Sequence, residues 1–187
     1  MHSGKPVAPL TELGRTRRQG SKISFLPDKE VFETLEMNYD IIVKRLRELA
    51  YLNRGVLFRI LDERERAGQK QAEFMFDGGL SDFVKYLNED KTALYDEPLH
   101  FKGSKDGIQV EIAFQHNDGY SESIFSYVNN IPTTEGGTHE TGFKAALTKI
   151  LNDYCRKNGI LKDKDPSISG EDFREGLTAV ISLKMHS

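Results

Sequence analysis

Residues 120–151 read YSESIFSYVNNIPTTEGGTHETGFKAALTKIL, and residues 169–177 read SGEDFREGL. The first stretch predicts a strand over residues 120–128, a glycine-containing turn, and an amphipathic helix over residues 141–157. The second stretch predicts a short helical turn over residues 171–175, followed by a buried strand over residues 177–183. Apolar side chains recur along the long helix at the spacing of one helix face: Phe143, Ala146, Leu147, Ile150, Leu151 and Tyr154.

A pair of strands precedes this stretch. Residues 108–114 alternate apolar and polar side chains, after a strand near residues 99–102 and a turn at Asp106-Gly107. Asn117-Asp118-Gly119 predicts a second turn. We therefore expect a meander, in which residues 120–128 return beside residues 108–114. A short amphipathic helix is predicted before the meander, marked by Leu80, Phe83, Val84 and Leu87.

The N-terminal part predicts a smaller set of elements. These are a strand over residues 22–26, a helix over residues 38–53, and two strands over residues 56–61 and 73–76. Gly78-Gly79 follows them and is the predicted domain boundary. After the boundary the order is helix, three strands, helix and strand, which indicates an α+β fold with helices on a sheet.

The composition is that of an ordinary soluble domain. The chain has 187 residues, of which 37% are hydrophobic and 29% charged, and its formal net charge is −3. A slightly acidic chain lacks the overall excess of positive charge that attracts nucleic acid, so DNA contact needs a local basic patch. No apolar run approaches the roughly 18 residues of a membrane helix, so we expect a cytoplasmic protein with no membrane partner. Two small basic groups are candidates for DNA contact: Arg15, Arg17 and Arg18, and Lys44, Arg45 and Arg47.

The turn Glu135-Gly136-Gly137-Thr138-His139 has two interpretations. Glycines before a helix let backbone amides approach a phosphate, but the spacing is not that of a P-loop because Phe143 follows Gly142. The simpler interpretation is a tight turn that needs a positive φ, which we favour.

Metal chemistry is not predicted. His139-Glu140 lacks the second histidine that a zinc-protease helix needs, because Phe143 stands at that position. The other histidines form no spaced ligand cluster. From the residues alone, the chain is a soluble α+β protein without a complete active site.

The same motifs carry a family resemblance. The stretch over residues 120–177 resembles the transducer region of the B subunits of bacterial type II topoisomerases, which are DNA gyrase and topoisomerase IV. Residues 4–77 resemble the C-terminal part of the ATPase domain of these proteins. The matching motifs are Gly20-Ser21-Lys22-Ile23, Phe25-Leu26-Pro27-Asp28 and Arg45-Leu46-Arg47-Glu48-Leu49-Ala50. The likeness extends over nearly the whole chain, from Gly4 to Lys184.

The resemblance implies a fold and a division into domains. Residues 1–78 are expected to be the C-terminal portion of a GHKL-type ATPase sandwich. Residues 79–187 are expected to form a transducer domain that resembles domain 2 of ribosomal protein S5, with a β-α-β crossover, and to be truncated at its C-terminal end. The implied function is a segment of the ATP-hydrolysing subunit that couples ATP binding and B-subunit dimerisation to DNA strand passage and supercoiling.

Few functional residues carry over. Ser21 matches a position whose hydroxyl helps to hold adenine, and Ile23 an apolar position in the wall of the adenine pocket. Lys144 matches a basic position that faces the cavity through which DNA passes. The implied cofactors are ATP and Mg²⁺, but most of their ligands are expected before Met1 or after Ser187. The implied partners are DNA, a gyrase A-type subunit and a second B subunit, and the chain alone is expected to be inactive.

A different class of function stays open, namely a stand-alone nucleic-acid- or protein-binding module with an S5-like fold. The absence of a strongly basic face counts against it. DNA binding by this chain alone at physiological salt would favour it.

The N-terminal part predicts self-association, because a sheet with one uncovered face exposes apolar surface. Light scattering is expected to show species larger than a monomer, together with binding of a hydrophobic dye. A clean monomer that binds no dye would contradict this expectation.

Overall fold

The computed structural model describes residues 5–9, 11–12, 14–17, 19–64, 68–162 and 164–186. The chain divides into two units, Met1–Tyr39 and Asp40–Ser187, and each is described by itself. Apart from a bridge residue at Lys5 and the first helical residue, Tyr39, the described part of the first unit consists of turns and irregular backbone. The strand predicted over residues 22–26 is therefore wrong. A strand needs a neighbour for its backbone N–H and C=O groups, and among the described residues no strand pairs with this segment.

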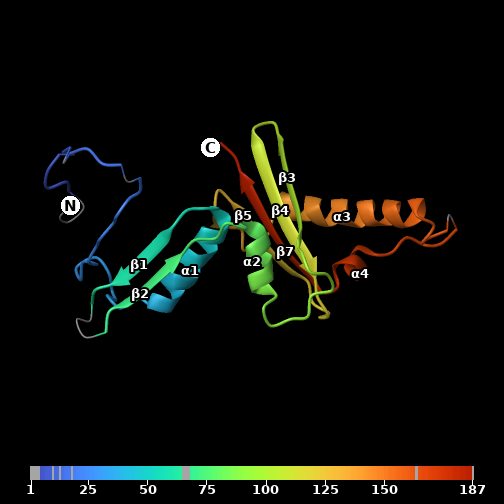
Figure 1. Ribbon diagram of the computed structural model, residues 1–187, viewed down its shortest axis with the longest axis horizontal. Coiled ribbons are helices and arrows are strands. Elements are labelled where there is room, and N and C mark those ends of the chain that lie inside the picture. The colour runs from blue at the N-terminus through green and yellow to red at the C-terminus, as the bar shows by residue number, and fades with distance from the viewer. Residues whose placement is uncertain are drawn as a thin grey trace. The chain divides into compact units, whose positions relative to one another are not determined.

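The second unit contains the helices and strands (Figure 1). They follow the predicted order, with strand β6 as an addition that the sequence did not predict. The elements are α1 (Tyr39–Leu52), β1 (Phe58–Asp62), β2 (Lys70–Phe74), α2 (Leu80–Leu87), β3 (Leu99–Lys105), β4 (Ile108–His116), β5 (Ser123–Val128), β6 (Ile131–Pro132), α3 (Thr138–Lys157), α4 (Gly170–Arg174) and β7 (Leu177–Lys184).

The main sheet has the strand order β3-β4-β7-β5-β6, so the predicted meander is wrong. Strand β7 lies between β4 and β5, antiparallel to β4 and parallel to β5. The physical reason is burial: residues 177–182 are all buried, and a strand this apolar is most stable at the centre of a sheet. The connection from β5 through α3 to β7 is the β-α-β crossover that the resemblance implies.

The turn at Asn117-Asp118-Gly119 is consequently not a hairpin. The side-chain Oδ1 of Asn117 accepts a hydrogen bond from the Gly119 backbone N–H at 2.9 Å. The backbone N–H of Asn117 donates to the carbonyl of Gly176 at 2.9 Å, which connects the segment to the start of β7 rather than to β5.

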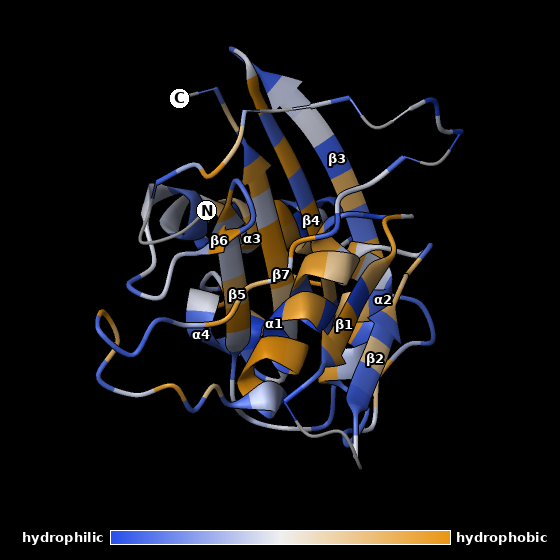
Figure 2. Cartoon of the chain, turned by 90° about the vertical axis from the view of Figure 1, so that its left-hand side faces the viewer, coloured by the Kyte–Doolittle hydropathy of each residue, from blue (hydrophilic) through white to orange (hydrophobic). Residues whose placement is uncertain are grey.

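Helices cover both faces of the main sheet. Neighbouring residues of one strand point to opposite faces, so Ala113 and Phe114 of β4 belong to different cores. Ala113 packs with residues of α1 and α2, while Phe114 packs with α3. Figure 2 shows hydrophobic residues concentrated on β7 and on α1. The first core contains Tyr51, Leu52, Leu80, Phe83, Val84, Ala113, Tyr127 and Val180, and the second contains Phe114, Leu147, Leu177 and Ala179.

A buried polar cluster joins α2 to the sheet. The Thr178 hydroxyl donates to Asn88 Oδ1 at 2.7 Å, and Asn88 Nδ2 donates to Gln115 Oε1 at 3.1 Å. Asn117 Nδ2 donates to Asn88 Oδ1 at 3.3 Å. These buried groups are therefore hydrogen-bonded, which removes most of the cost of their burial.

Apolar side chains are exposed around the small sheet of β1 and β2, as the sequence predicts. They are Ile41, Val56, Leu57, Leu61 and Met75, each at least 45% exposed. Among the described residues, no helix has the length and apolar character needed to cross a membrane.

Replacement of Gly176 by alanine is expected to destabilise the protein. Its φ is 69°, and a Cβ at this position overlaps the carbonyl oxygens of Asn117 and Gly119. Strain of this kind costs roughly 1–3 kcal/mol, which denaturant unfolding measures.

Gly142→Ala is the matched control, since Gly142 lies inside α3 with open space where a Cβ would be. Alanine there is expected to stabilise the helix by about 0.5–1 kcal/mol. Equal effects of the two substitutions would contradict the positive φ of Gly176 and its close approach to the carbonyls of Asn117 and Gly119.

Candidate functional site

The glycine turn connects β6 to α3 and adopts the simpler of the two predicted forms. Gly136 has a φ of 75°, in the left-handed region that favours glycine, whereas Gly137 is extended. The backbone N–H of Gly136 donates to the carbonyl of Thr133 at 2.9 Å, which closes the turn.

Side chains hold this turn against β5. The Thr133 hydroxyl donates to the carbonyl of Ser126 at 3.0 Å, and the two hydroxyl oxygens of these residues are 2.5 Å apart. His139 Nε2 lies 3.2 Å from Thr133 Oγ1. This contact links the start of α3 to the turn through the imidazole ring. The histidine of this motif therefore orients the turn.

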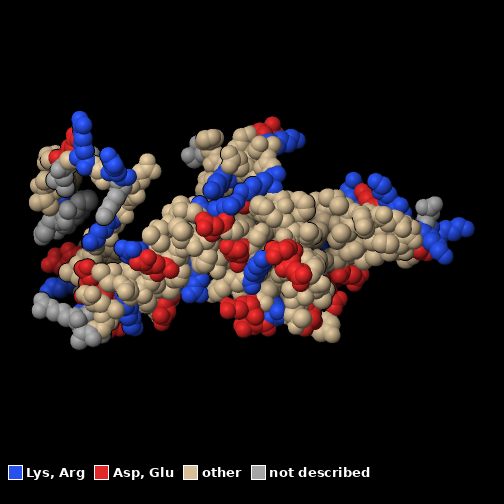
Figure 3. All heavy atoms as spheres, in the orientation of Figure 1, with Lys and Arg blue, Asp and Glu red and all other residues tan. Residues whose placement is uncertain are grey.

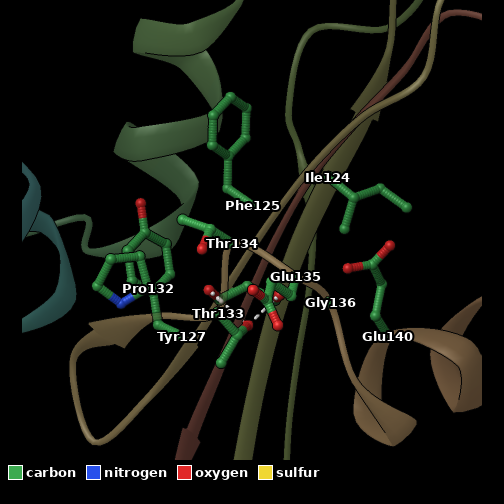
Figure 4. Close-up of a pocket in the computed structure, with 10 residues that line it drawn as sticks. Ile124, Phe125, Tyr127, Pro132, Thr133, Thr134, Glu135, Gly136 and Glu140 are labelled. Carbon is green, nitrogen blue, oxygen red and sulfur yellow. Dashed lines mark hydrogen bonds between the residues drawn. The ribbon is translucent and has the colours of Figure 1, made fainter.

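A cavity of about 400 Å³ lies between this turn, β5 and the start of α3 (Figure 4). Its lining includes the carboxylates of Glu135 and Glu140. Two carboxylates repel a phosphate, so the arrangement counts against direct phosphate contact by this turn.

Lys144 lies in a cluster of four charged side chains that connects three elements. Its Nζ is 2.7 Å from Glu122 Oε1 and 3.0 Å from Glu140 Oε1. Arg174 Nε is 2.5 Å from Glu122 Oε2. Glu122 directly precedes β5, Lys144 and Glu140 lie on α3, and Arg174 ends α4. The cluster is electrically neutral and joins the start of β5 to both helices.

The pKa values of the cluster reflect this pairing. Burial raises the pKa of Glu122, but the hydrogen bonds from Lys144 and Arg174 together lower it below the usual value of 4.5. Hydrogen bonds to Glu122 and Glu140 raise the pKa of Lys144 above 10.5. The positive charge of Lys144 is therefore balanced within the protein, and its predicted role in a DNA cavity stays a prediction.

The other two predicted site residues lie in the unit of residues 1–39. Ser21 and Ile23 are both exposed on irregular backbone. Their predicted roles at adenine stay predictions.

Two members of the second predicted basic group have partners within the protein. Arg45 forms an ion pair with Glu48 at 2.9 Å, and Arg47 donates to the Tyr86 hydroxyl at 2.7 Å. Arg18, of the other group, lies outside the described residues. Basic and acidic side chains are interspersed over residues 40–187 in the view of Figure 3.

Sequence reasoning did not find the partners of Lys144. The spacing of Glu140 and Lys144 is a detectable signal, because side chains four residues apart meet on a helix. Arg174 and Glu122 are 52 residues apart, and only the fold brings them together. Within the described ranges, no group of three or more His, Cys, Asp or Glu side chains could hold a metal.

Glu122→Gln is expected to lower stability at neutral pH by about 1 kcal/mol, as for other partly exposed ion pairs. Because the folded pKa of Glu122 is depressed, its contribution is present above pH 4.5 and is lost as the pH falls through the folded pKa. The gap between variant and wild type should therefore close in acid, as followed by denaturant unfolding at several pH values.

Glu89→Gln is the control, since Glu89 is exposed and outside the cluster. A Glu122→Gln deficit that stays constant down to low pH would contradict the ion-pair assignment.

Comparisons with known proteins agree with this fold. The family model described as DNA gyrase B matches residues 79–187. The DNA gyrase B protein of Bacillus mycoides is 52% identical over 97% of this chain and 45% of its own length. The topoisomerase 4 B protein of Enterococcus faecalis is 48% identical over 97% of this chain and 26% of its own length. The chain thus spans less than half the length of these curated relatives.

A solved structure extends the likeness to three dimensions. The 43K ATPase domain of Thermus thermophilus gyrase B, solved in complex with an aminocoumarin, has 40% sequence identity and a TM-score of 0.75. The match covers 86% of this chain and 43% of that one. With a family model that matches more than half of its residues, the chain belongs to the DNA gyrase B family.

Proposed function

We propose that this chain is the segment of a type II DNA topoisomerase B subunit that couples ATP binding and subunit dimerisation to DNA strand passage and supercoiling. The observation that carries the proposal is the similarity over 97% of the chain to the B proteins of gyrase and topoisomerase IV. The match to a solved gyrase ATPase domain supports the ATP-dependent part.

The shared core supports a coupling role. The C-terminal end of α1 contributes Tyr51 and Leu52 to the core that also contains Ala113, Tyr127 and Val180 of the main sheet. We propose residues 1–78 as the end of the ATPase domain and residues 79–187 as the transducer, with a boundary at Gly78-Gly79. In this division the core crosses the boundary, so a displacement of α1 is transmitted directly to the sheet.

The described residues of this chain do not fit ATP or Mg²⁺ by themselves. They contain no cluster of metal-ligating side chains, and the cavity beside the glycine turn is lined by two carboxylates. In the proposed subunit, most ligands of the nucleotide and of magnesium therefore lie outside this chain. Ser21 and Ile23 are the proposed exceptions, at the adenine.

The partners follow from the proposed function. They are DNA, a gyrase A-type subunit, and a second B subunit that associates when ATP binds, all in the cytoplasm. Lys144 is the proposed contact to DNA in the dimer cavity. Such a contact requires Lys144 to leave Glu122 or Glu140, because both carboxylates engage its Nζ.

The purified 187-residue chain is expected to show no ATP hydrolysis above a blank, because its described residues form no complete nucleotide site. The full-length subunit that carries these residues, mixed with its A-type partner, is expected to change the linking number of a closed plasmid only when ATP is added. A coupled-enzyme ATPase assay and gel electrophoresis of plasmid topoisomers measure the two activities.

Two results would overturn the proposal. One is ATP hydrolysis by the 187 residues alone. The other is a full-length product that changes no plasmid topology with ATP and its A-type partner present. A gel shift with the chain alone at physiological salt would instead support the binding-module alternative.

A further inference from the structure

The turn between β5 and β6 consists of two asparagines, Asn129 and Asn130, called here the asparagine turn. Val128 pairs with Ile131, so these residues are the complete loop of a two-residue hairpin. Their φ angles are 49° and 65°, as a type I′ turn requires. Glycine is the ordinary residue at the second position of such a turn. The backbone therefore explains an asparagine at 129 but gives no reason for a side chain at 130.

Asn129 joins the turn to the end of the central strand. Its Oδ1 accepts from the Met185 backbone N–H at 3.0 Å, and its Nδ2 donates to the Met185 carbonyl at 3.0 Å. Its own N–H donates to the carbonyl of Leu183 at 2.8 Å. Three hydrogen bonds thus connect this one residue to the exit of β7.

Asn130 joins the same turn to helix α1. Its Nδ2 donates to Asn53 Oδ1 at 3.1 Å, and its carbonyl accepts a hydrogen bond from the Arg45 guanidinium. Asn53 in turn donates to the Leu49 carbonyl at 2.7 Å. The turn therefore contacts α1 at two places, about two helical turns apart.

One atom of this arrangement is unsatisfied. Asn130 Oδ1 is buried and has no hydrogen-bond partner among the described residues. A buried acceptor without a donor favours any rearrangement that supplies one. The contact with α1 is thus directional, and it leaves one buried acceptor of Asn130 without a partner among the described residues.

We propose that the asparagine turn is the positioning element that couples α1 to the exit of β7, and that Asn130 is its switching residue. This inference rests on the proposed function: α1 lies on the ATPase side of the proposed boundary and β7 on the transducer side. When α1 shifts, the Asn130–Asn53 bond breaks, while Asn129 keeps the turn attached to β7.

Asn130→Gly tests the inference, because glycine keeps the turn conformation and removes only the side chain. In the 187-residue chain, the midpoint of denaturant unfolding should stay close to that of wild type. In a double-mutant cycle on unfolding, Asn130→Gly and Asn53→Ala should be non-additive, as expected for side chains in contact.

In the full-length subunit with its A-type partner, Asn130→Gly should lower the strand-passage events per ATP hydrolysed by about fivefold or more, a usual size for coupling between sites. ATP hydrolysis itself should continue. Asn53→Ala should give the same deficit, and the double variant should be no worse than either single one.

Asn158→Ala is the matched control. Asn158 Nδ2 donates to the carbonyl four residues earlier in α3, at 2.8 Å, as Asn53 does in α1. Loss of this bond should leave the ratio of strand passage to ATP hydrolysis unchanged.

The outcomes are separable. If the wild-type subunit is active and Asn130→Gly leaves the ratio of strand passage to ATP hydrolysis unchanged, the inference alone is overturned. Additive effects of Asn130→Gly and Asn53→Ala on unfolding would overturn it as well. If Asn130→Gly lowers the unfolding midpoint and reduces strand passage and ATP hydrolysis in proportion, the inference is also overturned, and the role of Asn130 is purely structural. A wild-type subunit without ATP-dependent strand passage overturns the proposed function and, with it, the role assigned to the turn.

Discussion

The pairing of β7 on both of its edges is the constraint on which the rest of the structure depends. Strand β7 forms eight residue pairs with β4 and six with β5, and its residues 177–182 are buried. Its alternating side chains contribute Val180 to one core and Ala179 to the other. The placement of α1 and α2 on one face and of α3 on the opposite face therefore follows from a single strand.

Polar contacts then hold the parallel strands β5 and β7 together at both ends. At their starts, Glu122 before β5 pairs with Arg174 before β7. At their exits, Asn129 after β5 bonds to Met185 after β7. The first connection also includes Lys144 of α3, and the second reaches α1 through Asn130. The two helices are thus attached to opposite ends of one rigid strand pair, which suits an element that transmits displacement.

The sequence predicted local structure well and long-range arrangement poorly. The helices over residues 80–87 and 141–157 were predicted because their apolar spacing is a local signal, and the structure confirms both. The position of β7 between β4 and β5 was missed because an alternating pattern identifies a strand but not its neighbour. The strand over residues 22–26 was wrong for the same reason, since β-propensity supplies no partner.

In the candidate site, too, local features were predicted from the sequence and long-range contacts were not. The turn at Gly136 was predicted from its glycines, and the Glu140–Lys144 pair was detectable from its spacing. The pairing of Glu122 with Arg174 and the contact of Asn130 with Asn53 depend on tertiary structure, so no spacing rule predicts them. Family resemblance supplied Ser21, Ile23 and Lys144 as site residues, and these assignments stay predictions.

The late position of β7 in the chain has a consequence for biosynthesis. Strands β4 and β5 are made well before the strand that separates them, so both have an unpaired edge until residues 177–184 leave the ribosome. Sheets closed by distant segments fold slowly, and the exposed edges are open to incorrect pairing in the interval. The nascent chain is therefore expected to need protection by chaperones over the length of α3 and α4, and to become resistant to proteases only once β7 has inserted.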